Sequence, residues 1–377
     1  MSIRRESAHR YEALDGLRGI AALSVMLGHF GQILGVYWPA HMFLAVDAFF
    51  IMSGFVIAHS YSERLRRGMP ALSYLYRRLT RLYPMFIAGL TLGAAVLYYG
   101  ARSGAIAYAT GDILHSVALN AAYIPFLNTA RIGSDLGQIF PADPPAWSLF
   151  LEMLASGAFL LLFDLKRNAL IGICTAFYLA LISVDIYLAQ GSAAWITVSN
   201  GFDTSNFLGG VPRVGFGFVC GVILQGLMRE GYGAHRMSEL GRRVPYPSFA
   251  LYAVLLAVFV FPKSLHGIYP AVAIATLAPA IVFIGAHIRT RNGLETNVAR
   301  ALGWISYPVY CLHVPVVRLA IYARGGPQSP PYAMMFVSAA ITLGLAAALA
   351  KWYEEPLRSA LTGAGRPPPV HPAPAPD

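Results

Sequence analysis

Two residues in the first apolar segment have side chains and a spacing that could bind an anion and move a proton. Arg18 and His29 lie 11 residues apart, which is about three helical turns and returns the second side chain to nearly the same helix face. Their separation along the axis would be roughly 16 Å. A guanidinium holds anions and an imidazole titrates near neutral pH. One helix face would therefore carry an anion site at one end and a base deeper in.

Two further arginines, Arg78 and Arg81, are three residues apart in the stretch YLYRRLTRLYP. On a helix they share a face, and Pro84 is expected to end or restart that helix one turn later. Two guanidiniums on one face suit a bidentate grip on phosphate. The alternative, which also applies to Arg18, is that these are positive charges that anchor and orient the chain in a membrane.

A carboxylate in the segment PPAWSLFLEM could assist the imidazole. Glu152 follows Trp147 by five residues, and a tryptophan at the membrane interface would place Glu152 at a depth similar to that of His29. A carboxylate beside an imidazole orients it and supports its charged form. We therefore expect Glu152 to contact His29, the alternative being a structural hydrogen bond between helices.

Other polar residues within apolar segments are weaker candidates. The stretch FFIMSGFVI places Ser53 beside Gly54, where a glycine lets a backbone or a ligand approach closely. Ionisable side chains inside a membrane usually mark function, and His313, Arg213 and Arg318 are further examples; each could equally form a structural pair. No metal site is predicted, because the cysteines lie within apolar stretches and no His-Glu-x-x-His spacing occurs.

The elements that must position these residues are predicted from composition and from apolar runs. Of 377 residues 56% are hydrophobic and 12% charged, against roughly a quarter charged in soluble domains. That excludes a soluble globule or a nucleic-acid module, despite the net charge of +10. A membrane-spanning helix needs about 20 apolar residues, and such runs occur at 15–37, 42–60, 83–100, 147–163, 169–187, 207–228, 248–262, 268–288, 301–323 and 333–353.

The distribution of positive charge predicts the orientation of these ten segments. With the amino terminus inside, 20 of the 28 Lys and Arg fall on the inner side, four on the outer side and four within the segments. Positive charge is retained in the cytoplasm, so both termini are expected there. The apolar stretch 111–128, broken by polar residues, is then interfacial or re-entrant. No cleavable signal peptide is expected.

The resulting prediction is an all-α, polytopic integral membrane protein with ten transmembrane helices. It comprises a cytoplasmic amino terminus (1–14), a transmembrane domain (15–358) and a proline-rich, disordered tail (359–377). The glycine pairs Gly89/Gly93 and Gly217/Gly221 have the spacing of close helix packing.

The motifs resemble those of the acyltransferase 3 family, integral membrane enzymes that acylate hydroxyls of cell-surface carbohydrates and related compounds. The blocks that carry the resemblance occur in order and span about residues 11 to 358: LDGLRGIAALSVMLGHF, FFIMSGF, RLTRLYP, WSLFLE, SYPVYCLHVP and the ending YEEPLR, with Glu354 as its acid.

This resemblance implies an acyl-CoA donor, with acetyl-CoA expected, taken from the cytoplasm, and a route for the acyl group through the membrane. It implies that His29 is the base or a transient acyl carrier, and that the arginines bind the donor. The predicted site comprises His29 and Glu152 in catalysis; Arg18, Arg78, Arg81 and Ser53 at the acyl-CoA; and His313 and Arg213 at the substrate.

The expected partners are a carbohydrate or other hydroxyl-bearing acceptor, the lipid bilayer and polysaccharide assembly proteins, in the inner membrane of the cell, with no nucleic acid. Two alternatives follow from the residues alone. A proton-coupled secondary transporter of a polar solute could use the same buried His, Glu and Arg. A lipid-carrier or sensor protein could hold them as structural charges.

Overall fold

The computed structural model describes residues 11–37, 39, 41–127, 137–189, 196–262, 267–325 and 330–363. Over these residues the chain is helical, and its extended pairing is limited to an isolated bridge between Gln138 and Asp203. The prediction that 359–377 is disordered is wrong for 359–363, which are helical; the rest of that tail and the first ten residues lie outside the described part. The α-helices are α1 (Glu12–Leu34), α2 (Leu44–Arg66), α3 (Ala71–Arg102), α4 (Thr110–Ala121), α5 (Ala146–Leu162), α6 (Arg167–Leu188), α7 (Gly210–Arg229), α8 (Ala234–Arg243), α9 (Pro247–Phe259), α10 (Tyr269–Val272), α11 (Ala278–His287), α12 (Gly293–Ala323), α13 (Pro331–Leu349) and α14 (Glu355–Gly363).

The predicted fold class, an all-α polytopic membrane protein, is confirmed. Two π turns join neighbouring helices, Ala273–Leu277 between α10 and α11 and Ala350–Glu354 between α13 and α14, and the 3-10 turn Phe207–Gly209 directly precedes α7. Counting such joined helices as one, eight helices in the described ranges are long and apolar enough to cross a membrane, and α5 and α9 are shorter apolar helices. They fall in order on the ten predicted segments. The number of crossings and the side on which the termini lie stay predictions.

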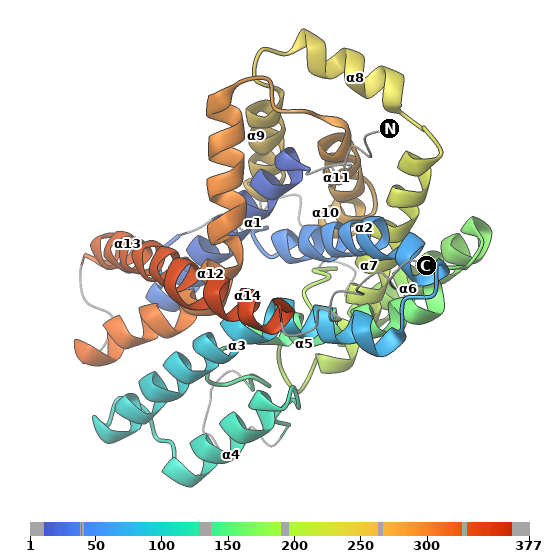
Figure 1. Cartoon of the computed structure of the whole chain (residues 1–377). Helices are drawn as coiled ribbons and strands as arrows, with labels where there is room; N and C mark the ends of the chain where they lie inside the picture. Colours follow the sequence, from blue (N-terminus) through green and yellow to red (C-terminus); the bar gives the residue numbers. More distant parts are fainter. Residues whose placement is uncertain are drawn as a thin grey trace, which may run out of the picture.

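The segment after α3 does not form a spanning helix. The 12 residues of α4 reach about 18 Å, whereas the hydrocarbon core is about 30 Å thick. The helix packs beside α3 at one edge of the bundle (Figure 1). This agrees with the expectation that 111–128 is not a transmembrane segment.

The expectation that Pro84 ends or restarts a helix is wrong. One continuous helix, α3, begins 12 residues before the predicted segment and contains Pro84. Proline removes a backbone donor and favours a kink, but membrane helices tolerate it where neighbours support the backbone. Here the hydroxyl of Tyr307 on α12 donates a hydrogen bond to the carbonyl of Leu82, so α12 supports α3 beside its proline.

The first helix, α1, lies at the centre of the bundle, against α12 and α2 (Figure 1). Its glycines permit this close approach. A Cβ on Gly19 would lie 2.3 Å from the Cβ of Leu302 on α12, and one on Gly16 would lie 1.8 Å from the hydroxyl of Tyr252 on α9. The contact with α12 fixes how the face of α1 that carries Arg18 is presented to that helix.

The predicted glycine contacts are confirmed at the interface of α2 and α7. A Cβ on Gly54 would lie 1.9 Å from the carbonyl oxygen of Phe218, and one on Gly221 would lie 2.0 Å from the carbonyl oxygen of Ile51. The pair Gly89/Gly93 likewise faces backbone, since added Cβ atoms would lie 2.3 Å from the carbonyl oxygen of Cys311 and 2.0 Å from that of Ala142. Small residues thus set the helix spacing.

Replacing Gly54 with alanine is expected to destabilise the protein by about 1–3 kcal/mol, because the new methyl group meets backbone and the two helices must separate. The measurement is the thermal unfolding of the purified protein in detergent. Gly157→Ala on α5 is the control, because nothing lies within 4 Å of its Cβ position. Equal melting temperatures for the two variants would contradict this packing.

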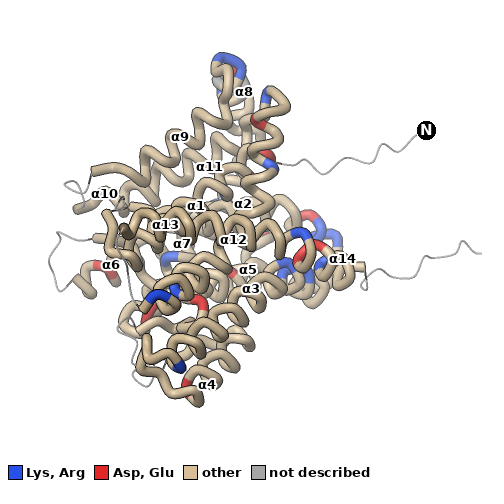
Figure 2. Tube along the Cα trace, turned by 90° about the vertical axis from the view of Figure 1, so that its left-hand side faces the viewer, with Lys and Arg blue, Asp and Glu red and all other residues tan. Residues whose placement is uncertain are grey.

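The surface is apolar between clusters of charge. Figure 2 shows Lys and Arg gathered beside α14 and at α8, with long uncharged stretches between. On α6, Leu179 and Tyr187 have exposed fractions of 59% and 82%. A helix with such an outward face suits contact with lipid rather than with water.

Candidate active site

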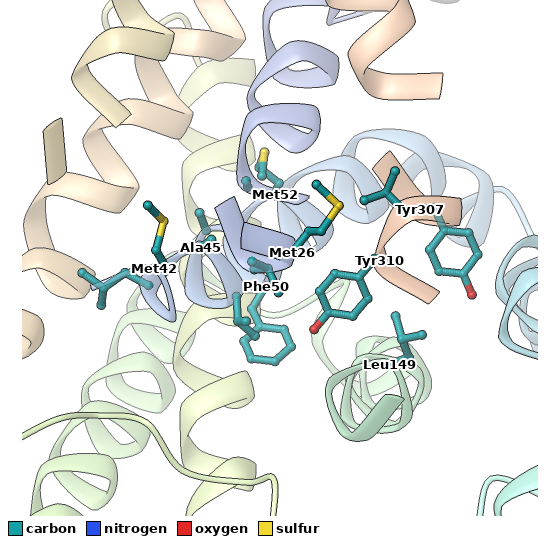
Figure 3. Packing of buried hydrophobic residues seen from close by; sticks show 14 of the residues in the cluster. Met26, Met42, Ala45, Phe50, Met52, Leu149, Tyr307 and Tyr310 are labelled. Carbon is teal, nitrogen blue, oxygen red and sulfur yellow. The ribbon is translucent and has the colours of Figure 1, made fainter. Parts of the chain in front are cut away.

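A cavity lies among α1, α2, α3, α5 and α12, and its empty volume of about 440 Å³ includes space open to solvent. Figure 3 shows Phe50, Leu149 and Tyr310, from three of these helices, around the same region. Its wall combines apolar side chains with polar and charged ones that could orient a ligand. The lining residues that could do chemistry are Arg18, Ser148, Glu152, Ser306, Tyr307 and Tyr310.

One arginine, Arg18, lines this cavity. It lies within electrostatic range of Arg78 and Arg81 and of the carboxylates of Asp15 and Glu152. The Arg18 guanidinium makes no hydrogen bond or salt bridge with any residue of the described ranges. The spacing of Arg78 and Arg81 thus brings both near Arg18, as a shared anion site requires.

Glu152 contacts an arginine of the cavity region rather than the imidazole of His29. Its Oε1 accepts hydrogen bonds from the hydroxyl of Ser53 at 2.7 Å and from Arg78 at 3.3 Å. Arg78 also donates to the hydroxyl of Ser156 at 3.4 Å. The expected contact between Glu152 and His29 is wrong: similar depth does not place two side chains on facing sides of their helices.

Arg81 is held by an acid from the end of the bundle. Its guanidinium donates to Glu354 at 2.8 Å and lies 5.7 Å from the centre of the Tyr307 ring. Glu354 belongs to the π-helical turn that links α13 to α14, and such turns often re-aim a side chain at a functional site. The YEEPLR ending therefore contacts the arginine stretch of α3.

The partner of His29 is His313 on α12. The Nδ1 of His29 lies 2.8 Å from the Nε2 of His313, and the planes of the two rings are nearly parallel, at 8°. The Nδ1 of His313 lies 3.0 Å from the carbonyl oxygen of Val309. Since a carbonyl only accepts, this Nδ1 carries the proton, and the Nε2 of neutral His313 is an acceptor.

The hydrogen-bond chain therefore fixes the tautomer of His29. His29 donates from Nδ1 to His313, which leaves its Nε2 with a lone pair that can accept a proton. Sequence reasoning singled out both residues but assigned His313 to substrate. The helical spacing of Val309 and His313, four residues apart, is the signal that could have identified this chain.

Tyr310 connects the cavity to the histidine pair. Its ring centre lies 5.9 Å from that of His313, and its hydroxyl is 2.7 Å from the hydroxyl of Ser148. Arg18 and His29 thus both face α12, one at the cavity and the other at His313. The prediction that they share one face of α1 agrees with this arrangement. Sequence reasoning missed Tyr310 and Ser148.

Arg213 lies in a separate, fully buried ion pair. It donates to both carboxylate oxygens of Asp47 at 2.8 Å and to the carbonyls of Asn200 at 3.2 Å and Phe43 at 3.1 Å. Of the two roles expected for Arg213, substrate contact or structural pair, its geometry is that of the second.

Arg318, also expected to pair, holds a buried non-helical segment that precedes α5. It donates to the carbonyl of Pro141 at 2.6 Å and to Gln138 at 2.7 Å. In the same segment Asp143 is completely buried, and neither of its carboxylate oxygens has a hydrogen-bond partner among the described residues. Irregular backbone inside a bundle needs such internal donors.

The family model described as "Acyltransferase domain", of the acyltransferase 3 family, matches residues 11–351 of the chain. The chain belongs to the acyltransferase 3 family. It is therefore a multi-pass membrane acyltransferase. The matched range contains every residue of the arginine site on α1 and α3 and of the histidine pair.

Two relatives of this acyltransferase 3 protein match parts of its length. The chain is 33% identical over 159 residues to "Protein 2 in picA locus" of Rhizobium radiobacter, covering 40% of the chain and 81% of that protein. It is 30% identical over 153 residues to "Putative membrane-bound transacylase BcsY" of Komagataeibacter xylinus, covering 38% of the chain and 35% of that protein. No solved structure matches the chain.

Proposed function

We propose that this protein moves an acyl group, expected to be acetyl, from cytoplasmic acyl-CoA to a hydroxyl of a cell-surface or exported carbohydrate, in the inner membrane. The observation that carries the proposal is the arrangement along α1. An unpaired Arg18 lines the cavity beside two other arginines, and His29 with a free Nε2 lies further along the face toward α12.

The arginine end suits the phosphates of coenzyme A. That molecule is polyanionic and does not enter hydrocarbon, so its phosphates would stay where guanidiniums meet water. Its uncharged pantetheine arm can pass between helices toward the histidine pair. The axial distance from Arg18 to His29, roughly 16 Å, is of the order of that arm's reach.

The histidine end suits acyl transfer by general base catalysis. The Nε2 of His29 takes the proton of the acceptor hydroxyl as the oxygen attacks the thioester carbonyl. The carbon–sulfur bond then breaks, and the leaving thiolate takes the proton back from His29. While His29 is charged, its Nδ1 proton remains hydrogen-bonded to His313, whose acceptor nitrogen stabilises the imidazolium as a triad acid does.

A covalent route uses the same atoms. The Nε2 of His29 attacks the thioester carbonyl, and coenzyme A leaves as a thiolate. The acceptor oxygen then attacks the acyl-imidazole, the bond from the acyl carbon to Nε2 breaks, and the hydroxyl proton passes to the thiolate, which regenerates neutral His29. The two routes share the donor site and the requirement for a neutral His29. The carbohydrate acceptor and the involvement of polysaccharide assembly proteins rest on the family resemblance.

The test uses membranes from cells that express the protein, supplied with acetyl-CoA carrying a labelled acetyl group. We expect the label to appear as alkali-labile ester in the carbohydrate fraction, and the glycans of a deletion strain to lack the corresponding acyl mass. Label that remains in coenzyme A while glycan masses stay unchanged would overturn the proposal. Uptake of a polar solute without ester formation would instead favour a transporter.

Replacing Arg81 with glutamine is expected to raise the KM for acyl-CoA about tenfold with a smaller change in kcat, because a charge-assisted contact worth about 1.5–3 kcal/mol is lost from donor binding. The measurement is initial transfer rate against donor concentration. Arg77→Gln on the same helix, at an exposed position, removes the same charge. Equal KM values for both variants would contradict the phosphate role.

A further inference from the structure

A second cavity lies where α2 and α7 end and α6 begins, and it shares no lining residue with the first. Its empty volume of about 480 Å³ includes space open to solvent. It is lined both by basic or polar side chains and by apolar ones: Arg66, Arg167, Arg229, Glu230, Ser62 and Gln225, with Phe163, Leu165, Leu170, Val222 and Ile223.

The cavity has an excess of positive charge. Arg167 is neutralised by Glu230 at 2.7 Å, and Arg66 donates to Asp164 at 3.0 Å and to the carbonyl of Phe163 at 2.8 Å. Arg229 makes no hydrogen bond or salt bridge with any residue in the described part of the chain. Two of the three guanidiniums that line the cavity are thus paired with carboxylates, Arg167 with Glu230 and Arg66 with Asp164, and the third, Arg229, is available to an anion.

The surroundings of the cavity are those of a membrane-facing groove. Leu161 and Ile171, which are close in sequence to the lining residues Phe163 and Leu170, have exposed fractions of 79% and 46%. They lie on α5 and α6, whose junction forms one wall. A ligand with a phosphate and hydrocarbon tails could place the phosphate at the arginines and its tails along these apolar side chains.

We propose that this cavity binds the phosphate of an anionic membrane phospholipid. The predicted orientation places it on the cytoplasmic side, where basic pockets between helices recognise such headgroups. The lipid would add a phosphate contact at this end of α2, α6 and α7, next to the buried apolar side chains Leu65, Leu170 and Val222 that already pack the three helices together. This site is separate from the proposed acyl transfer, and its occupancy does not depend on that activity.

Native mass spectrometry of the purified, delipidated full-length protein tests the proposal. Phosphatidylglycerol and phosphatidylcholine are added in turn, and inorganic phosphate or coenzyme A serves as a soluble competitor. We expect retention of phosphatidylglycerol, with an affinity lowered about fivefold in Arg229→Gln, since one basic side chain near the surface contributes about 1 kcal/mol.

Arg67→Gln is the control, because it removes one guanidinium at the end of α2 and its side chain is 77% exposed and outside the cavity. Equal phosphatidylglycerol binding by the two variants would overturn the site, as would equal retention of the two lipids. Displacement of the lipid by millimolar phosphate or coenzyme A would show that the cavity binds a soluble phosphate, and it would overturn the proposal that the ligand is a phospholipid. Melting temperatures verify that both variants are folded.

Discussion

Replacing His29 with glutamine is expected to lower the rate of acyl transfer by at least about a hundredfold, because the variant lacks the basic Nε2 that removes the acceptor proton or carries the acyl group. Glutamine keeps an amide that can donate to His313, so the bundle is expected to fold. Donor binding is expected to persist, since the arginines that would hold the phosphates lie on other turns and helices.

His313 provides the control for this assignment. If it acts only by holding the tautomer of His29, His313→Gln lowers kcat less than His29→Gln, and the double variant is no slower than His29→Gln alone, because residues that act as a unit are not additive. Activity is measured as ester formation per folded protein, with acyl-CoA binding measured separately. Full transfer by His29→Gln at normal protein level would remove His29 from the mechanism.

The helices could be predicted from apolar runs, and their polar extensions could not. A search for apolar runs finds the part of a helix that lies in the hydrocarbon core, and it ends where charged residues begin. For this reason the first turns of α12, which carry Glu295 and the side-chain cap of Asn292, were outside the predicted segment 301–323. For the same reason, and because Pro84 was expected to interrupt the helix, the first 12 residues of α3 were not predicted as part of it.

The candidate site could be predicted as a set of residues but not as a set of contacts. Spacing along one helix gives depth and face, which is why Arg18 and His29 could be placed on one side of α1. It does not say which helix lies opposite. The packing of α1 against α12 places His313 beside His29, and the packing of α3 against α5 places Glu152 beside Arg78.

Glycines illustrate the same division. The sequence predicted that Gly54 and the pair Gly217/Gly221 would allow close approach, and the structure confirms it. The partners are backbone carbonyls, of Phe218 for Gly54 and of Ile51 for Gly221, and a single sequence carries no record of such pairing. Whether a residue allows close approach is a local property that the sequence shows, whereas the helix that approaches it depends on the packing of the whole bundle.

Replacing Arg213 with leucine is expected to destabilise the protein by about 3–5 kcal/mol, because it leaves the buried carboxylate of Asp47 without its counter-charge. The arginine is 1% exposed and bridges α7 to α2 through both carboxylate oxygens. The measurement is thermal unfolding in detergent, with the yield of folded protein as a second readout.

A double variant separates the structural role of Arg213 from substrate binding. Arg213→Met with Asp47→Leu removes both charges, and we expect it to regain most of the lost stability, since replacing a whole buried ion pair by apolar groups is often neutral. The carbonyls of Asn200 and Phe43 lose a donor in the process, so recovery is incomplete. A stable double variant that transfers acyl groups normally would show that Arg213 holds the helices together. If it is stable but its KM for the acceptor is raised, Arg213 contacts the substrate, and the ion pair with Asp47 is the resting arrangement of a binding residue.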